Sequence, residues 1–189
     1  MEIIKSSNDF YTSVEKALDE IDLKWRDYKG LLVLGTHSPD DIEKKLHAIE
    51  NARIDRRPAL GICFGMQLMA VEYAKNQCGI EDACSEEYSA SGSHIITKLP
   101  RIRVGLQKVA GWWGTTDESH WHNYSFNSSF KDHFKDSWEM SENDGVVEII
   151  RYKNYPFFVG VQFHPEYQST KERPHPVLKD FIDVCSRIK

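Results

Sequence analysis

A cysteine flanked by two glycines is the first feature of this 189-residue sequence that predicts covalent chemistry. Cys63 lies between Gly61 and Gly65, after a short apolar segment and before a segment with helical spacing. Glycines on both sides leave room for a sharp strand-to-helix turn that pushes the thiol out of the sheet. The N-terminus of the following helix favours the negatively charged thiolate. We therefore interpret Cys63 as a nucleophile.

The sequence His164-Pro165-Glu166, at the end of another apolar segment, supplies the partners that such a nucleophile needs. A thiol requires a base, and the base requires a group that orients it. Pro165 stiffens the turn, so one imidazole nitrogen can face the thiol while the Glu166 carboxylate holds the other. The pattern predicts a catalytic triad of Cys63, His164 and Glu166.

The elements that position these residues alternate between strands and helices in the first half of the chain. After a short strand at Glu2–Ile4, Asn8 or Asp9 is expected to cap a helix that ends near Ile21. Further helices are expected over 38–52, 65–74 and 177–188, and strands buried in a parallel sheet over 31–34 and 58–62. This alternation predicts an α/β fold with right-handed crossovers.

The second half of the chain reads as short strands separated by turn residues. These strands are expected over 94–97, 101–109, 146–152 and 157–163, with turns at Gly111, Gly114, 143–145 and 154–156. The chain shows no internal repeat and no low-complexity linker. With a length close to that of one ordinary domain, residues 1–189 are predicted to form a single domain.

Composition excludes several classes of function. Lys and Arg number 24 against 29 Asp and Glu, a net charge of −5 that argues against nucleic acid as the main partner. No apolar run approaches the ~20 residues that span a bilayer, and the N-terminus lacks the pattern of a signal peptide. The four cysteines do not have zinc-site spacing. We expect reduced thiols in the cytoplasm, no membrane association, and neither metal nor cofactor.

Beyond these motifs, several segments resemble the class I glutamine amidotransferases, and are most similar to the glutaminase domains of CTP synthases. The similar segments are Phe10–Val14 with Ala17 and Leu18, Gly30–Gly35, Ala59–Asn76, Ser85–Tyr88, His120–Tyr124 and Phe157–Ser169. The resemblance follows the chain in order over nearly its whole length. It implies a stand-alone, single-domain amidotransferase with a flavodoxin-like fold, in which helices flank a central, mostly parallel sheet.

The resemblance also implies a mechanism on glutamine or a glutamine-like amide. Cys63 would attack the side-chain amide to form a γ-glutamyl thioester, which water then hydrolyses. Backbone N–H groups of Phe64, Gly35 and Thr36 would stabilise the oxyanion. Substrate contacts are expected from Gln67, Glu87, Asn123 and Tyr124, with Glu87 at the α-ammonium group.

Two departures from the family pattern leave the substrate open. Thr36 stands where the family has a glycine in its oxyanion loop, and Asn123 stands where an arginine is expected to bind the α-carboxylate of glutamine. One interpretation is a glutaminase that has drifted, or that needs a partner, such as a separate synthetase or acceptor subunit, to order its loop. Another is a hydrolase of a γ-glutamyl-like amide without a free α-carboxylate, or of a related amide, with Trp112, Trp113 and Trp121 either widening the pocket or packing in the core or a lid. A third is a catalytically weak regulatory or partner subunit.

Overall fold

The computed structural model describes residues 1–4, 9–36 and 38–188, in which a six-stranded sheet forms the centre of the molecule. In spatial order its strands are β1 (Glu2–Ile4), β2 (Leu31–Val33), β3 (Ala59–Ile62), β9 (Phe158–Val161), β8 (Val146–Tyr152) and β7 (Trp138–Asn143). The first four are mutually parallel, and β8 and β7 add to them in antiparallel fashion. The prediction of an α/β fold with a mostly parallel sheet is confirmed.

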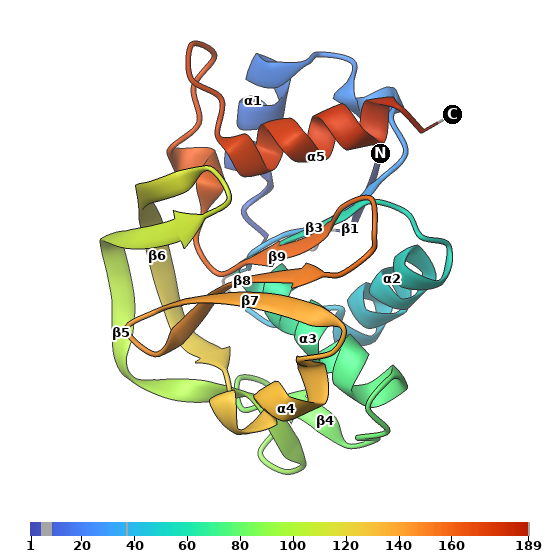
Figure 1. The fold of residues 1–189 in the computed structure, drawn as a ribbon, viewed down its shortest axis with the longest axis vertical. Coiled ribbons are helices and arrows are strands. Elements are labelled where there is room, and N and C mark those ends of the chain that lie inside the picture. Colours follow the sequence, from blue (N-terminus) through green and yellow to red (C-terminus); the bar gives the residue numbers. More distant parts are fainter. Residues whose placement is uncertain (5–8, 37, 189) are drawn as a thin grey trace.

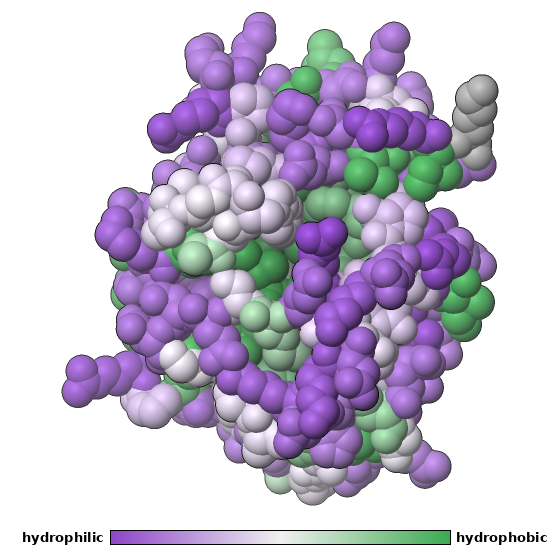
Figure 2. Space-filling model, in the orientation of Figure 1, coloured by the Kyte–Doolittle hydropathy of each residue, from purple (hydrophilic) through white to green (hydrophobic). Residues whose placement is uncertain are grey.

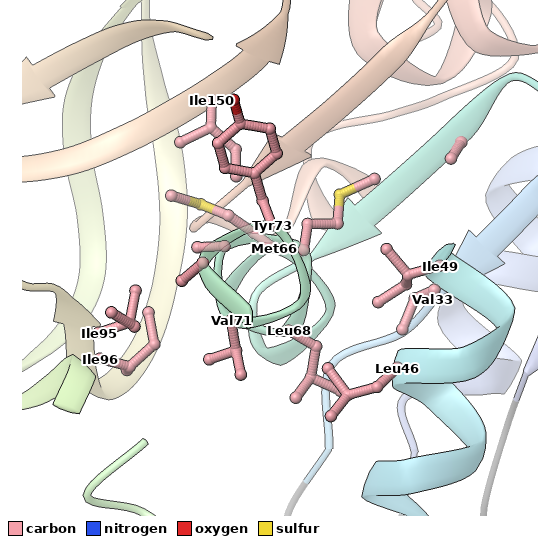
Figure 3. Close-up of a cluster of buried hydrophobic side chains, with 14 of the residues drawn as sticks. Val33, Leu46, Ile49, Met66, Leu68, Val71, Tyr73, Ile95, Ile96 and Ile150 are labelled. Atoms are coloured by element: carbon pink, nitrogen blue, oxygen red, sulfur yellow. The ribbon is translucent and has the colours of Figure 1, made fainter. Parts of the chain in front are cut away.

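Helices cover both faces of this sheet (Figure 1). On one face, α1 (Tyr11–Ile21) and α5 (Pro176–Ser186) pack in one apolar cluster; on the other, α2 (Ile42–Ile54) and α3 (Phe64–Asn76) pack in a second. Figure 3 shows α3 at the centre of the second cluster, with Leu46 and Ile49 of α2 on one side of it and Ile95 and Ile96 on the other. The helix that follows Cys63 is therefore held by apolar neighbours around its circumference.

A second sheet lies beside the first and contains β4 (Ala83–Ser85), β5 (Ser93–Gly111) and β6 (Gly114–Phe126). β5 and β6 form a long antiparallel hairpin along one side of the molecule (Figure 1). The strands predicted separately over 94–97 and 101–109 are parts of β5, whose register shifts between Lys98 and Arg103. The predictions did not include β4, β6 or β7. The short helices are η1 (Trp25–Asp27), η2 (Ser128–Phe130), α4 (Lys131–Phe134) and η3 (Pro165–Tyr167).

Two helices begin later than predicted. Helix α1 begins at Tyr11 with Phe10 as its N-cap, because Asp9 instead forms an antiparallel bridge with Thr36; Asn8, the other expected cap, lies outside the described residues. Helix α2 begins at Ile42 rather than near Ser38, since Asp41 has a left-handed conformation with φ of 54° that interrupts the helical path. Helices α3 and α5 contain the segments predicted for them, to within two residues at the C-terminus of α5.

The face with β7 and β8 is mostly hydrophilic, and apolar residues are visible in a hollow below α5 (Figure 2). This hollow has a volume of about 350 Å³ and is lined in part by Trp112, Phe157 and Val159. It contains none of the site residues predicted from the sequence. Among the described residues, no helix has both the length and the apolar character needed to cross a membrane.

Candidate active site

Cys63 lies at the junction of β3 and α3 with a strained backbone, φ 52° and ψ −106°. Positive φ is unfavourable for a residue with a Cβ, and such strain is typical of nucleophile turns. A Cβ on Gly61 would lie 2.7 Å from backbone atoms of Gly65, and one on Gly65 would collide with the carbonyl oxygen of Val33. The two glycines therefore allow strand and helix to approach each other, while the unusual φ is at Cys63 itself.

His164 follows β9 and is oriented by the residue two positions further on. Its Nδ1 donates a hydrogen bond to Oε1 of Glu166 over 2.8 Å, and both side chains are buried. Burial alone would lower the pKa of His164, but the nearby Cys63 and the charge and hydrogen bond of Glu166 raise it well above its ordinary value. Nε2 of His164 is buried and makes no hydrogen bond with a described atom, so it remains available for proton transfer.

The loop after β2 brings two further predicted residues to this pair. A Cβ on Gly35 would lie 3.0 Å from Cε1 of His164 and 3.3 Å from Cβ of Cys63, so this position has no room for a side chain. The carbonyl of Gly35 accepts a hydrogen bond from the N–H of Phe10 over 3.0 Å, which belongs to the bridge between Asp9 and Thr36. This bridge holds the loop against the start of α1.

Thr36 and Phe64 both have backbone N–H groups that could face an oxyanion. No described atom accepts a hydrogen bond from either N–H group. Phe64 is the first residue of α3, where N–H groups have no acceptor within the helix. The hydroxyl of Thr36 donates to the carbonyl of Ser38 over 2.6 Å, so the threonine side chain fixes the loop turn. Both residues line the cavity into which Cys63 opens.

This cavity has a volume of about 130 Å³, and most of the site residues predicted from the sequence line it. It is lined by Thr36, Cys63, Phe64, Gln67, Glu87, Ile102, Trp121, His122, Asn123 and Tyr124. The four residues predicted to bind substrate are therefore together, although they come from α3, from the segment after β4 and from β6. Gly35 and His164 lie beside Cys63 and complete the arrangement.

Two glutamines form a hydrogen-bonded chain to the thiol of Cys63. Of the two, only Gln67 was predicted from the sequence as a site residue. The Nε2 of Gln67 donates to the backbone carbonyl of Tyr124 over 3.1 Å and to Oε1 of Gln162 over 3.3 Å. In turn, Nε2 of Gln162 donates to Sγ of Cys63 over 3.7 Å. Gln162 lies two residues before His164, so its proximity to the predicted base was an available signal.

His122 is a second site residue that the sequence analysis did not assign. Its Nδ1 donates to the carbonyl of Tyr124 over 2.9 Å, and burial lowers the pKa of His122 to about 3. The neutral ring therefore keeps a bare Nε2, which has no partner among the described atoms. The same motif contains Asn123, which is exposed at the cavity wall.

Glu87 contributes the only carboxylate of the cavity lining described here. Burial raises the pKa of Glu87 to about 7. Its backbone N–H donates to the Ser85 hydroxyl over 3.1 Å, which fixes the turn that carries it. A positively charged ligand group would stabilise the ionised form.

The three tryptophans do not act together. Trp121 lines the cavity and is 62% exposed, whereas Trp112 and Trp113 lie at the other end of the β5–β6 hairpin. Trp113 packs against Phe163 and His175, and Trp112 donates a hydrogen bond from Nε1 to Asp180 over 2.8 Å. The suggestion that Trp112 and Trp113 widen the substrate pocket is therefore wrong. Across the described residues, no group of three or more His, Cys, Asp and Glu is arranged to hold a metal ion.

Comparison with known proteins shows the family to which the chain belongs. A model of the family "Glutamine amidotransferase class-I" matches residues 6–184. The chain belongs to the class I glutamine amidotransferase family.

The similar proteins place the chain more narrowly within that family. It is 35% identical to CTP synthase of Clostridium acetobutylicum over 94% of this chain and 38% of the relative, and 38% identical to CTP synthase of Sulfolobus acidocaldarius over 93% of this chain and 37% of the relative. The chain thus spans less than half the length of these CTP synthases.

Solved structures share its fold. The glutaminase domain of Trypanosoma brucei CTP synthase, with bound acivicin, matches with a TM-score of 0.87 at 20% identity, covering 99% of this chain and 93% of that one. A GMP synthase subunit of Thermoplasma acidophilum, described as putative, matches with a TM-score of 0.65 at 18% identity, over 97% and 92% of the two chains. The glutaminase-domain fold predicted from the sequence is confirmed.

Proposed function

We propose that this protein is an amide hydrolase that releases ammonia from glutamine or a glutamine-like amide through a Cys63-His164-Glu166 triad. One observation carries the proposal: a cysteine with strained backbone opens into a cavity beside an imidazole that a buried carboxylate orients over 2.8 Å. The chain would act as one amidotransferase domain.

In the proposed first half-reaction, the Cys63 thiolate attacks the carbonyl carbon of the side-chain amide. The N–H groups of Phe64 and Thr36 receive the negative charge that develops on the oxygen. Nδ1 of His164 is held by Glu166, so the other ring nitrogen gives its proton to the amide nitrogen. The C–N bond breaks, ammonia leaves, and a γ-glutamyl thioester remains on Cys63.

In the second half-reaction, His164 is neutral and takes a proton from water. The resulting hydroxide attacks the thioester carbonyl, and the same N–H groups again stabilise the oxyanion. The C–S bond then breaks, which releases the carboxylic acid and returns the thiolate and imidazolium ions. Glu166 keeps the imidazole in one orientation through both steps.

A protein that accepts the ammonia is part of the proposal. The matched relatives are CTP synthases of which this chain spans 37–38%, and a further structural match is a GMP synthase subunit. We propose that a synthetase or other acceptor subunit works with this domain. Action in the cytoplasm stays a prediction.

An ammonia-release assay tests the proposal against the alternative of a non-catalytic subunit. The wild-type protein should release ammonia from at least one glutamine-type amide, and Cys63→Ala should release none. A γ-carbonyl electrophile resembling glutamine should label the wild type once per chain and at Cys63. Absence of both turnover and labelling would favour the regulatory role.

A further inference from the structure

Charge distinguishes the lining of the substrate cavity. Among its lining residues that the structure describes, none is Lys or Arg, and Glu87 is the one carboxylate. A carboxylate ligand in a small, partly buried cavity needs a cationic partner to compensate for its lost hydration. The cavity as built therefore disfavours a free α-carboxylate.

Arg103 and Lys45, two of the cations close to the lining residues, are already paired. Arg101, the other neighbour of Ile102, and Lys98, opposite Tyr124 in the hairpin, are not among the lining residues. Arg103 neighbours Ile102 on β5, but its Nη2 binds Oε1 of Glu148 over 2.9 Å. Lys45 packs over the ring of Phe64, and its Nζ binds Oδ1 of Asp9 over 3.0 Å with both side chains fully buried. Recruiting either cation to a substrate would break a buried ion pair.

The same cavity is rich in hydrogen-bond acceptors. Oε1 of Gln67 and Nε2 of His122 are buried and have no partner among the described atoms. No described residue forms a salt bridge or a side-chain hydrogen bond with the carboxylate of Glu87. These acceptors suit a ligand that carries N–H donors, namely an ammonium group and a neutral amide.

Two exposed residues of the cavity lining are apolar. Ile102 on β5 and Trp121 on β6 line the cavity while remaining 48% and 62% exposed. Asn123 is two residues from Trp121, so both side chains lie on the same, exposed face of β6. A group attached to the α-carboxyl carbon near Asn123 would extend over these two apolar side chains.

We infer that the preferred substrate is a glutamine with a free α-amino group whose α-carboxyl group is in a neutral amide linkage, as in a glutamine residue at the start of a peptide. This inference rests on the proposed amide hydrolysis and names its substrate class. Glu87 binds the ammonium group, Asn123 contacts the neutral α-amide, and Trp121 and Ile102 pack against the following substituent.

The test compares ammonia release from free L-glutamine, L-glutamine α-amide and L-glutaminyl-L-leucine amide. We expect kcat/KM for both amides to exceed that for free glutamine by at least about tenfold, mainly through KM, because uniform binding changes KM rather than kcat. Equal or better kcat/KM for free glutamine would overturn the inference.

Substitution at Asn123 tests directly whether the cavity lacks a positive charge that would bind the α-carboxylate of glutamine. Asn123→Arg should raise kcat/KM for free glutamine by about tenfold or more and reduce it for the two amides. Asn123→Gln lengthens the side chain without charge and should give no gain on free glutamine. Thr115→Arg adds the same charge on an exposed part of β6 outside the cavity and should leave the preference unchanged.

Different results would contradict the proposed function and the proposed substrate class. If the wild type hydrolyses free glutamine with a lower KM than the α-amide, the proposed function stands and the substrate class is wrong. If no compound is hydrolysed and Cys63 is not acylated by any of them, both are wrong. An Asn123→Arg variant with unchanged preference would also contradict the role given to Asn123.

Discussion

Nδ1 of His164 lies 2.8 Å from Oε1 of Glu166, two residues further along the chain, and both side chains are almost completely buried. Pro165 lies between them at the first turn of η3, which fixes the backbone that joins the pair. Because little water reaches these atoms, the interaction is weakly screened and the ring has one orientation. That orientation presents the second ring nitrogen to Cys63.

Replacing Glu166 by Gln should therefore impair catalysis without unfolding the protein. The substitution keeps the shape but removes a charge that raises the pKa of His164. We expect kcat to fall by at least about 100-fold, the usual scale of general acid–base catalysis. The alkylation rate of Cys63 by iodoacetamide should also reach half its maximum at a higher pH, since a less basic imidazole makes proton transfer from the thiol less favourable. An unchanged pH profile would contradict the orienting role.

The raised pKa of His164 also has a consequence for stability. A group whose pKa is higher in the folded state stabilises that state fully below its unfolded value, here 6.5, and loses this contribution as the pH rises through the folded value. The free energy of unfolding lost in Glu166→Gln should therefore be larger at pH 6 than at a pH above the folded pKa. Urea denaturation at several pH values measures this difference.

Cys63→Ser should abolish turnover, while Cys78→Ser should leave it nearly unchanged. Cys78 is a matched control, because burial raises the pKa of its thiol and it lies after α3, away from the cavity. All four cysteines are free, so selective alkylation is a second measurement. Cys63 should react fastest near neutral pH; equal rates at the four thiols would count against its activation.

Glu87 predicts a pH dependence of substrate binding. With a pKa of about 7 in the free enzyme, its carboxylate becomes ionised between pH 6 and 8, so KM for a substrate with an α-ammonium group should fall over that range. Glu87→Gln should raise KM at pH 8 by roughly tenfold or more, as expected for loss of about 1.5–3 kcal/mol from a charge-assisted contact. The variant should also lose the pH dependence of KM.

The raised pKa of Glu87 also predicts a pH dependence of stability, in the same direction as that of His164. The folded state disfavours the ionised form of Glu87, so the wild type loses stability relative to Glu87→Gln as the pH rises from about 4.5 to about 7. Thermal denaturation of both proteins at the two ends of this range checks the direction. If the wild type instead becomes more stable relative to the variant over the same pH range, the carboxylate is not buried as described.

Arg53 and Glu72 form a buried ion pair between α2 and α3, with Nη2 and Oε1 2.6 Å apart. Glu72→Gln would leave a buried guanidinium without its countercharge, and we expect a loss of roughly 3–5 kcal/mol in the free energy of unfolding. Glu20→Gln, which breaks the exposed pair with Lys16, should change stability little. Chemical denaturation of the wild type and the two variants measures these changes. A loss in Glu72→Gln no larger than that in Glu20→Gln would show that the buried pair does not stabilise α3.

The sequence was sufficient to predict the parts of the fold where apolar residues set the pattern. The runs at Leu31–Val33 and Ala59–Ile62 are buried on both faces of the sheet and were recognisable as strands for that reason. Cys63 follows the second of these strands, and His164 and Glu166 follow β9, which lies within the strand predicted over 157–163, so their approximate positions came with the fold. The strained φ of Cys63 needed the coordinates.

Strand β6 could not be predicted in this way because its inward-facing residues are polar. Glu118, His120 and His122 alternate along it and are buried. His120 bonds to Glu148 over 2.9 Å, and Glu118 to His175 over 3.0 Å. Because the buried residues of β6 are polar, hydrophobic alternation gives no signal for the strand. Their partners are distant in sequence, so these hydrogen bonds cannot be recognised from the sequence either. The role of His122 in the cavity was hidden for the same reason.

Acid quenching during turnover, followed by mass spectrometry of peptides, tests whether Cys63 carries the covalent intermediate. With a substrate of the class proposed above, the account predicts a γ-glutamyl-type thioester on the peptide that contains Cys63. The adduct should be absent from Cys63→Ser and should accumulate on Cys63 at pH values where His164 cannot activate water. Ammonia release without an adduct on Cys63, or with the adduct on another residue, would contradict the account.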